Sequence, residues 1–113
     1  MKSKILALSK NEEFKNLLKK KKISNKYITI FYGNLKDKNK EKLNISFVAK
    51  KKIANAVKRN KIKRRLKNIF NEAVSLVLIK FNYSYLVIAK STMLNNNYTN
   101  IKDTIFQDFK KIR

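Results

Sequence analysis

The residues best suited to bind another molecule lie in one short basic segment. Residues 58–67 hold seven lysines and arginines in ten positions, and three of the four arginines, Arg59, Arg64 and Arg65, are among them. Lysine suffices where only charge is needed, whereas the planar guanidinium group of arginine grips phosphates and base edges. Since few acidic residues lie nearby to pair with these cations, the segment favours a contact with RNA over a passive solvated helix face.

Groups that perform catalysis are scarce in this chain. It contains no cysteine and no histidine, which excludes thiol and imidazole chemistry and zinc sites built on these ligands. The acidic residues are scattered and do not form the paired arrangement of a two-metal nuclease site. They are Glu12, Glu13, Asp37, Glu41, Glu72, Asp103 and Asp108, the last two expected on a surface helix. We therefore predict no catalytic residue and no metal site in the protein, and a self-sufficient nuclease is the disfavoured class.

Length and charge narrow the class of protein. A chain of 113 residues has the length of a single domain, residues 1–113, with one core. Its 29 lysines and arginines against seven acidic residues give a net charge of +22, which favours a polyanionic partner. The apolar run at residues 5–8 is too short for a signal sequence or a membrane span. We therefore expect a cytoplasmic protein with no membrane partner.

The segments around the basic residues predict a mixed domain. A capping box at residues 9–12 and apolar residues Phe14, Leu17 and Leu18 indicate a helix over about residues 10–20, closed by the lysines at 19–22. Residues 27–32 and 43–49 are typical of two antiparallel strands, with a polar turn at 33–42 between them. In the first strand, Tyr27 and Phe31 are expected on one face.

The second half of the chain predicts two helices around a buried strand. Asn55 is placed to cap a helix whose apolar positions gather within about 100° of arc; they are Ile62, Leu66, Ile69, Phe70 and Ala73. The cations lie opposite, except Arg59, which projects onto the apolar side, so that either the helix starts later or its first turn overhangs the core. Residues 85–89 favour a buried strand, and a last helix starts near Tyr98 with a stripe of Ile101, Ile105, Phe109 and Ile112. The order is α-β-β-(β)-α-β-α, with the bracketed strand open.

Residues 51–67 resemble the signature of a known family. A Lys-Lys pair at 51–52 is followed by Asn-Ala-Val at 55–57 and then by Arg-Asn-Lys-Ile-Lys-Arg-Arg at 59–65. This long, ordered pattern is similar to that of the bacterial ribonuclease P protein component. The resemblance extends to Asn11–Phe14 in the first helix, to the strand that begins at Tyr27, to residues 85–90 and to Asn97-Tyr98 at the last helix.

The resemblance implies a fold and a role. The fold is an α-β-β-β-α-β-α sandwich of class α+β, with a four-stranded sheet and a left-handed crossover, against the usual right-handed rule. The role is that of the accessory subunit of an endoribonuclease, which binds ribonuclease P RNA and the 5′ leader of precursor tRNA. Cleavage falls to the RNA and its Mg²⁺ ions, so the protein itself needs no cofactor and no obligate protein partner.

Two sets of binding residues follow from the resemblance. The RNA-binding set comprises Lys51, Lys52, Lys58, Arg59, Asn60, Lys61, Lys63, Arg64, Arg65 and Lys67. The leader-binding set lies in a cleft between the first helix and the sheet and comprises Phe14, Leu18, Tyr27 and Phe31. Bases of any sequence can stack on aromatic rings there. Core packing is the alternative for Phe14 and Leu18, and a ribosomal or general RNA-binding protein is the alternative function.

The sequence departs from the family pattern at several positions. Lys61 replaces the last arginine of the usual Arg-Asn-Arg triplet, so the charge is kept and the planar fork is lost. Leu18 stands where the family has a second cleft aromatic, and Ser46 and Ala54 replace glycines. These changes put leader affinity and local backbone geometry in question rather than the RNA-binding role.

Overall fold

The computed structural model describes residues 5–6, 11–33, 43–76, 83–95 and 97–110. The helices are α1 (Asn11–Leu18), α2 (Ala56–Ser75) and α3 (Tyr98–Phe109), with a 3₁₀ turn η1 (Ser91–Asn95). The strands are β1 (Ile5–Leu6), β2 (Lys21–Ser24), β3 (Ile28–Gly33), β4 (Leu43–Val48) and β5 (Ser84–Ala89). The order from α1 onward is α-β-β-β-α-β-α, which confirms the predicted α+β class.

The strands form a single mixed sheet in the order β1-β4-β5-β3-β2. β5 pairs antiparallel with β3 and parallel with β4, while β2 pairs antiparallel with β3. The four longer strands make the predicted sheet, and the two-residue β1, which the sequence analysis did not predict, adds a parallel edge beside β4. α2 connects the parallel neighbours β4 and β5 and is thus the crossover of the family fold. The left hand of this crossover stays a prediction.

The predicted pairing of the first two long strands needs a correction. β3 and β4 run in opposite directions, as expected, but β5 lies between them and pairs with both. They do not form a hairpin, because each finds an apolar partner in β5, which follows α2 in the chain.

The lysines after the first helix were also placed wrongly. α1 ends at Leu18, and Lys21 and Lys22 belong to β2, where they pair with Tyr32 and Phe31. This strand, before β3 rather than after β4, is the one that the sequence left open. Long charged side chains suit an edge strand, because they remain in solvent while the backbone pairs on one side.

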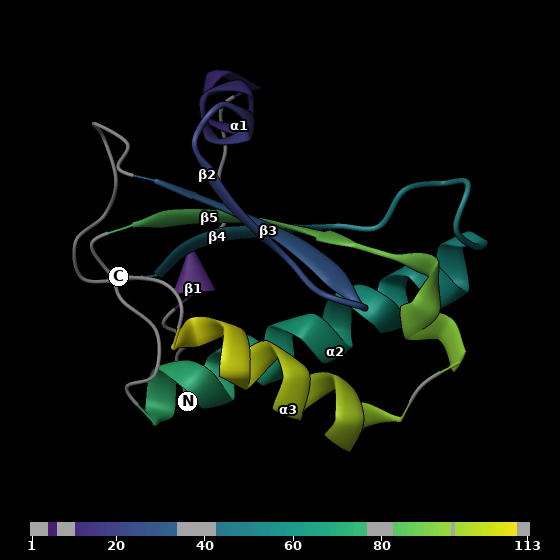
Figure 1. Cartoon of the computed structure of the whole chain (residues 1–113). Coiled ribbons are helices and arrows are strands. Elements are labelled where there is room, and N and C mark those ends of the chain that lie inside the picture. The colour runs from purple at the N-terminus through teal and green to yellow at the C-terminus, as the bar shows by residue number, and fades with distance from the viewer. Residues whose placement is uncertain (1–4, 7–10, 34–42, 77–82, 96, 111–113) are drawn as a thin grey trace.

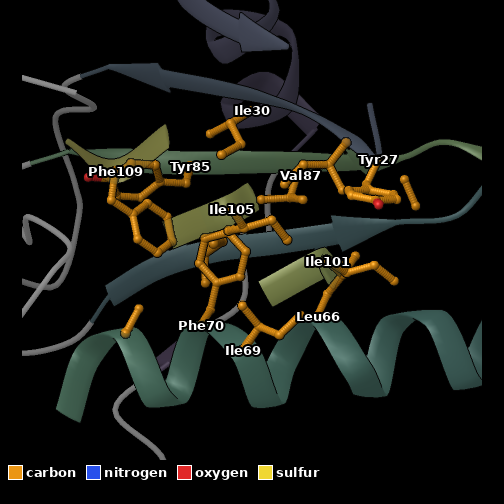
Figure 2. Close-up of a cluster of buried hydrophobic side chains, with 14 of the residues drawn as sticks. Tyr27, Ile30, Leu66, Ile69, Phe70, Tyr85, Val87, Ile101, Ile105 and Phe109 are labelled. Atoms are coloured by element: carbon orange, nitrogen blue, oxygen red, sulfur yellow. The ribbon is translucent and has the colours of Figure 1, made fainter. Parts of the chain in front are cut away.

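The main core lies between the sheet and the α2–α3 layer (Figure 1). Phe70 of α2 packs its ring 5.4 Å from Phe47 of β4 and 5.2 Å from Phe109 of α3, measured between centroids. Figure 2 shows how α2, α3, β3 and β5 all send side chains into this one cluster. The predicted apolar stripes of both helices are confirmed, as is the buried strand at residues 85–89.

α1 covers part of the opposite face of the sheet (Figure 1). Leu17 of α1 is fully buried against Leu86 of β5. The expected capping box at residues 9–12, the turn at 34–42 and Ile112 lie outside the residues described in detail. Asp108, expected on a surface, is buried, and the side-chain amide of Asn25 donates a hydrogen bond to its carboxylate at 2.6 Å. It lies next to Phe109 on the inner side of α3, where the amide compensates for lost hydration.

Candidate nucleic-acid interface

The basic helix α2 starts at a well-formed cap. The Asn55 side chain accepts a hydrogen bond from the Lys58 amide at 3.0 Å, and the Asn55 carbonyl accepts one from the Arg59 amide at 3.0 Å. The predicted cap is therefore confirmed, and regular helix begins at Ala56. The cap and the buried stripe of α2 together fix which side of the helix faces outward.

The outward side of α2 carries the predicted basic residues. Eight members of the RNA-binding set are exposed, while Arg59 and Arg65 are half-buried at the margin of the helix. The exposed members are Lys51, Lys52, Lys58, Asn60, Lys61, Lys63, Arg64 and Lys67. Glu72 of α2 forms an ion pair with Lys102 of α3, with 3.5 Å between Nζ and Oε1. Among the described residues, no carboxylate pairs with the cations of the RNA-binding set. The surface is therefore strongly electropositive.

The start of α2 decides how Arg59 is placed, which the helical projection left open. Since α2 already begins at Ala56, the first turn of the helix overhangs the core and carries Arg59 with it. Its Nε atom is buried and has no hydrogen-bond partner among the described residues. An unpaired buried donor of this kind costs about 1–3 kcal/mol, which an incoming acceptor recovers.

The second surface lies on the opposite face of the sheet, where α1 leaves the strands partly uncovered. Phe14 of α1 and Phe31 of β3 are both half-buried there and pack around the Leu17–Leu86 pair. Val48 of β4 and Ile88 of β5 complete this apolar cluster. We call it the α1 cleft, after the leader-binding cleft that the family resemblance implies. The structure thus brings together two of the four residues predicted for the leader-binding set.

The other two residues of that set are placed differently. Leu18, the last residue of α1, leaves 49% of its surface exposed and stays outside the buried cluster. Tyr27 is only 4% exposed and packs in the main core, on the other side of the sheet from Phe31. Placing Tyr27 in the cleft was therefore wrong.

The displacement of Tyr27 has a local cause. The Asn25 side-chain oxygen accepts hydrogen bonds from the amides of Tyr27 at 2.7 Å and Ile28 at 2.9 Å, which folds residues 25–28 into a turn. Strand alternation starts only at Ile28, so counting back from Phe31 in steps of two fails at Tyr27. Its ring, labelled in Figure 2, belongs to the core.

Sequence reasoning found Phe31 but missed the other strand residues of the cleft, Val48, Leu86 and Ile88. The pairing register sets Lys22, Phe31, Leu86 and Ser46 in one row across β2, β3, β5 and β4. A continuous apolar run such as 85–89 does not reveal which residues face which side, because both faces of β5 are covered. The sequence therefore did not show on which face Val48 and Ile88 lie; the pairing register decides it.

The arrangement is that of an α+β domain with two distinct surfaces on opposite sides of one sheet. One surface is the cationic face of α2, and the other is the apolar cluster under α1, which includes Phe14 and Phe31. In the described part of the chain, no helix combines the length and the hydrophobicity needed to span a membrane.

Comparison with known proteins agrees with this class. The family model for ribonuclease P matches residues 3–113. The ribonuclease P protein component of Carboxydothermus hydrogenoformans is 31% identical over 110 residues, which cover 94% of this chain and 90% of that protein. That of Mesoplasma florum is 32% identical over 91 residues, or 80% of each chain. The chain belongs to the ribonuclease P protein family.

Solved structures show the same fold. The ribonuclease P protein of Staphylococcus aureus superposes with a TM-score of 0.69 at 29% identity, covering 94% of this chain and 93% of that one. The Thermotoga maritima protein superposes with a TM-score of 0.79 at 21% identity, covering 96% and 98%. The family resemblance drawn from residues 51–67 is thereby confirmed over nearly the whole chain.

Proposed function

We propose that this protein, a component of ribonuclease P, docks on the catalytic RNA through α2 and holds the 5′ leader of precursor tRNA in the α1 cleft. The observation that carries the proposal is the separation of two binding surfaces by one sheet. The cationic side of α2 faces away from the sheet on one side, and Phe14 and Phe31 lie half-buried on the other. A single small domain can thus contact two RNA segments at once.

The α2 surface suits the phosphate backbone of a folded RNA. Arg64 and Lys67 are exposed and lie one turn apart on the helix, a spacing that matches contacts along a backbone. Arg59, half-buried in the first turn of the same helix, adds a guanidinium charge to this surface. Lys51 and Lys52, exposed just before the helix, extend the surface.

The α1 cleft suits a single strand of variable sequence. Stacking on an aromatic ring is insensitive to base identity, and leaders differ in sequence from one precursor to another. Phe14 and Phe31 come from different elements, so their rings are held by the α1–sheet packing rather than by local chain geometry. Leu18 lies outside this cluster, so Phe14 and Phe31 are the rings offered to bases. Ser46 adds a side chain in the same row as Leu86.

We assign the hydrolysis to the RNA subunit and its Mg²⁺ ions. Among the described residues, no three carboxylates lie close enough together to hold a metal ion. Glu72 is engaged with Lys102, and Asp108 is buried with Asn25. The part that we propose for the protein is to bring the RNA and its substrate together in the cytoplasm.

Reconstitution tests the proposal. We expect the protein to restore correct 5′ processing of precursor tRNA by ribonuclease P RNA at an Mg²⁺ concentration at which the RNA alone is inactive. A chain without this role gives no processing under the same conditions. Cleavage by the protein alone, with RNA rigorously excluded, contradicts the assignment of catalysis to the RNA.

A further inference from the structure

Among the described residues, the most exposed large apolar side chain lies in the basic helix α2. Val57 leaves 79% of its surface open to solvent, against 56% for Leu76 and 49% for Leu18. Leu18 is the last residue of α1 and Leu76 is the C-cap of α2, so both stand where a helix ends. Val57 is instead the second residue of a long helix, and it lies in neither apolar cluster of the fold.

Folding gives little reason for a valine at this position. A side chain that remains in solvent buries little apolar surface and adds little to packing. A β-branched side chain also favours a helix less than alanine does, and the start of α2 is already capped by the side chain of Asn55. Alanine would serve the helix at least as well, so the two additional methyl groups of Val57 are best explained by a contact outside the chain.

The geometry of α2 places Val57 within the cationic face. With 3.6 residues per turn, Val57 and Arg64 are two turns apart and lie within about 20° of the same line along the helix. Lys61 lies between them, one turn from Val57. The buried residues Ile62 and Leu66 point to the opposite side. A partner that lies along Arg64 and Lys61 toward the start of the helix therefore also covers Val57.

The surroundings of Val57 define the chemistry of that partner. Lys58, Lys61 and Arg64 are exposed, and no carboxylate among the described residues pairs with them. An apolar side chain ringed by unpaired cations fits a partner that alternates negative charge with uncharged surface. Folded RNA has this property, because its shallow minor groove presents riboses and base edges between two rows of phosphates.

We propose that Val57 packs against an uncharged face of ribonuclease P RNA, a ribose or a base edge, while Lys61 and Arg64 hold the flanking phosphates. The proposal rests on the proposed function, since it requires α2 to be the docking surface. It adds to the cationic contacts one that depends differently on salt. Cations gain affinity by releasing counterions from the RNA, whereas methyl groups gain it by leaving water.

The contact also bears on where the protein docks. Phosphates recur along every RNA, so charge alone distinguishes poorly between one site and another. Van der Waals contact requires a close fit, because it is lost when the two surfaces separate by an ångström or so. Val57 thus favours a site whose surface matches it over the many sites that the cations accept.

Salt titration separates the apolar contact from the cationic ones. Val57→Ala removes two methyl groups, and Val57→Thr exchanges one methyl for a hydroxyl at similar size and helix propensity. We expect affinity for ribonuclease P RNA to fall about tenfold in Val57→Ala and less in Val57→Thr, with the salt dependence of the wild type. Lys61→Ala is the comparison, because its plot of log affinity against log salt should be shallower by about 0.7–0.9 for one lost phosphate contact.

Two controls address the fold and the choice of site. Leu76→Ala truncates an exposed apolar side chain at the other end of α2 and should leave the affinity unchanged. Val57→Ala should unfold at the same or a slightly higher temperature than the wild type, because alanine favours the helix. With an unrelated folded RNA as competitor, the preference for ribonuclease P RNA should fall in Val57→Ala and persist in Leu76→Ala.

The possible failures are distinguishable. Wild-type affinity in Val57→Ala, an equal loss in Leu76→Ala, or a loss that comes with a shallower salt dependence overturns the role of Val57. If the unaltered protein does not bind ribonuclease P RNA, or if Lys61→Ala binds it as the wild type does at every salt concentration, α2 is not the docking surface and the proposed function itself is overturned.

Discussion

The two faces of the sheet are packed to different degrees. On the α2–α3 face, Tyr85, Val87 and Ala89 of β5 are closed off from solvent by two helices. On the α1 face, Leu86 is buried, but Ile88 and Phe31 remain half-exposed under a single eight-residue helix. Alternate residues of β5 are thus fully enclosed on one side of the sheet and partly exposed on the other.

The helices divide in the same way. α2 adds its apolar stripe to the main core and turns its cations outward, so its cationic face stands on the best-packed part of the molecule. α1 is short and packs only a small cluster, which includes Phe14 and Phe31. The RNA contacts that we propose for α2 are therefore separable from folding, whereas those that we propose for the α1 cleft use residues that also pack.

The largest expected effect is on the closed face. Phe70→Ala should lower the free energy of unfolding by about 3–5 kcal/mol, because it leaves a cavity among the rings of Phe47 and Phe109. Urea denaturation measures the change. Phe31→Ala serves as the comparison from the open face, and an equal loss there contradicts the contrast between the two faces.

The next effect is on RNA docking through α2. Replacing Arg64 and Arg65 together by alanine should weaken binding to ribonuclease P RNA by about 1–3 kcal/mol for each charge-assisted hydrogen bond that the variant no longer makes. The unfolding free energy should change little, since Arg64 is exposed and Arg65 lies at the helix margin. Filter-binding titration at moderate salt measures the affinity, with Lys26→Ala/Lys110→Ala as the charge-matched control. Equal affinity of both double variants rules out α2 as the docking surface.

Stacking in the α1 cleft gives an effect of similar or smaller size. Phe31→Ala should weaken binding of leader-bearing precursor tRNA by about 1–3 kcal/mol and leave mature tRNA unaffected, because only the precursor places bases on the ring. Competition binding to the reconstituted holoenzyme measures both affinities. If the affinity for the two RNAs falls equally, Phe31 is a packing residue and the cleft is not the leader site.

The smallest expected effect concerns the cap of α2. Asn55→Ala should cost about 1 kcal/mol of stability, because the Lys58 amide loses its side-chain acceptor. Asn68→Ala, at an exposed position inside the same helix, is the control and should be neutral or slightly stabilising. Thermal unfolding compares the two. A similar loss at both positions shows that the cap does not set the start of the basic helix.

Much of the fold could be predicted because several elements carry strong local signals. The apolar stripes of α2 and α3 and the apolar run of β5 were predicted from the sequence, and the structure buries them where they were predicted. β2 was missed because a run of lysines has no strand signature, and only the pairing with β3 makes Lys21 and Lys22 part of a strand. Tyr27 was misplaced because the side chain of Asn25 turns the chain before the strand begins.

The candidate site shows the same division. The cationic set could be predicted because the charge of a residue follows from its type. The apolar periodicity of α2 alone then shows which residues face outward. The cleft was readable at Phe14 and Phe31 only through the family resemblance. Its remaining residues, Val48 and Ile88, were set by the register of β4 and β5.

The sequence by itself determined the charge, the scarcity of catalytic groups, the phase of the long helices and the family. Those properties depend on residue type and on spacings within one turn or one strand. Only the tertiary structure decided that β5 separates β3 from β4 and that Tyr27 belongs to the core. Such contacts join residues distant in the chain, so their geometry follows from which strands pair and how the layers stack, and no local pattern encodes it.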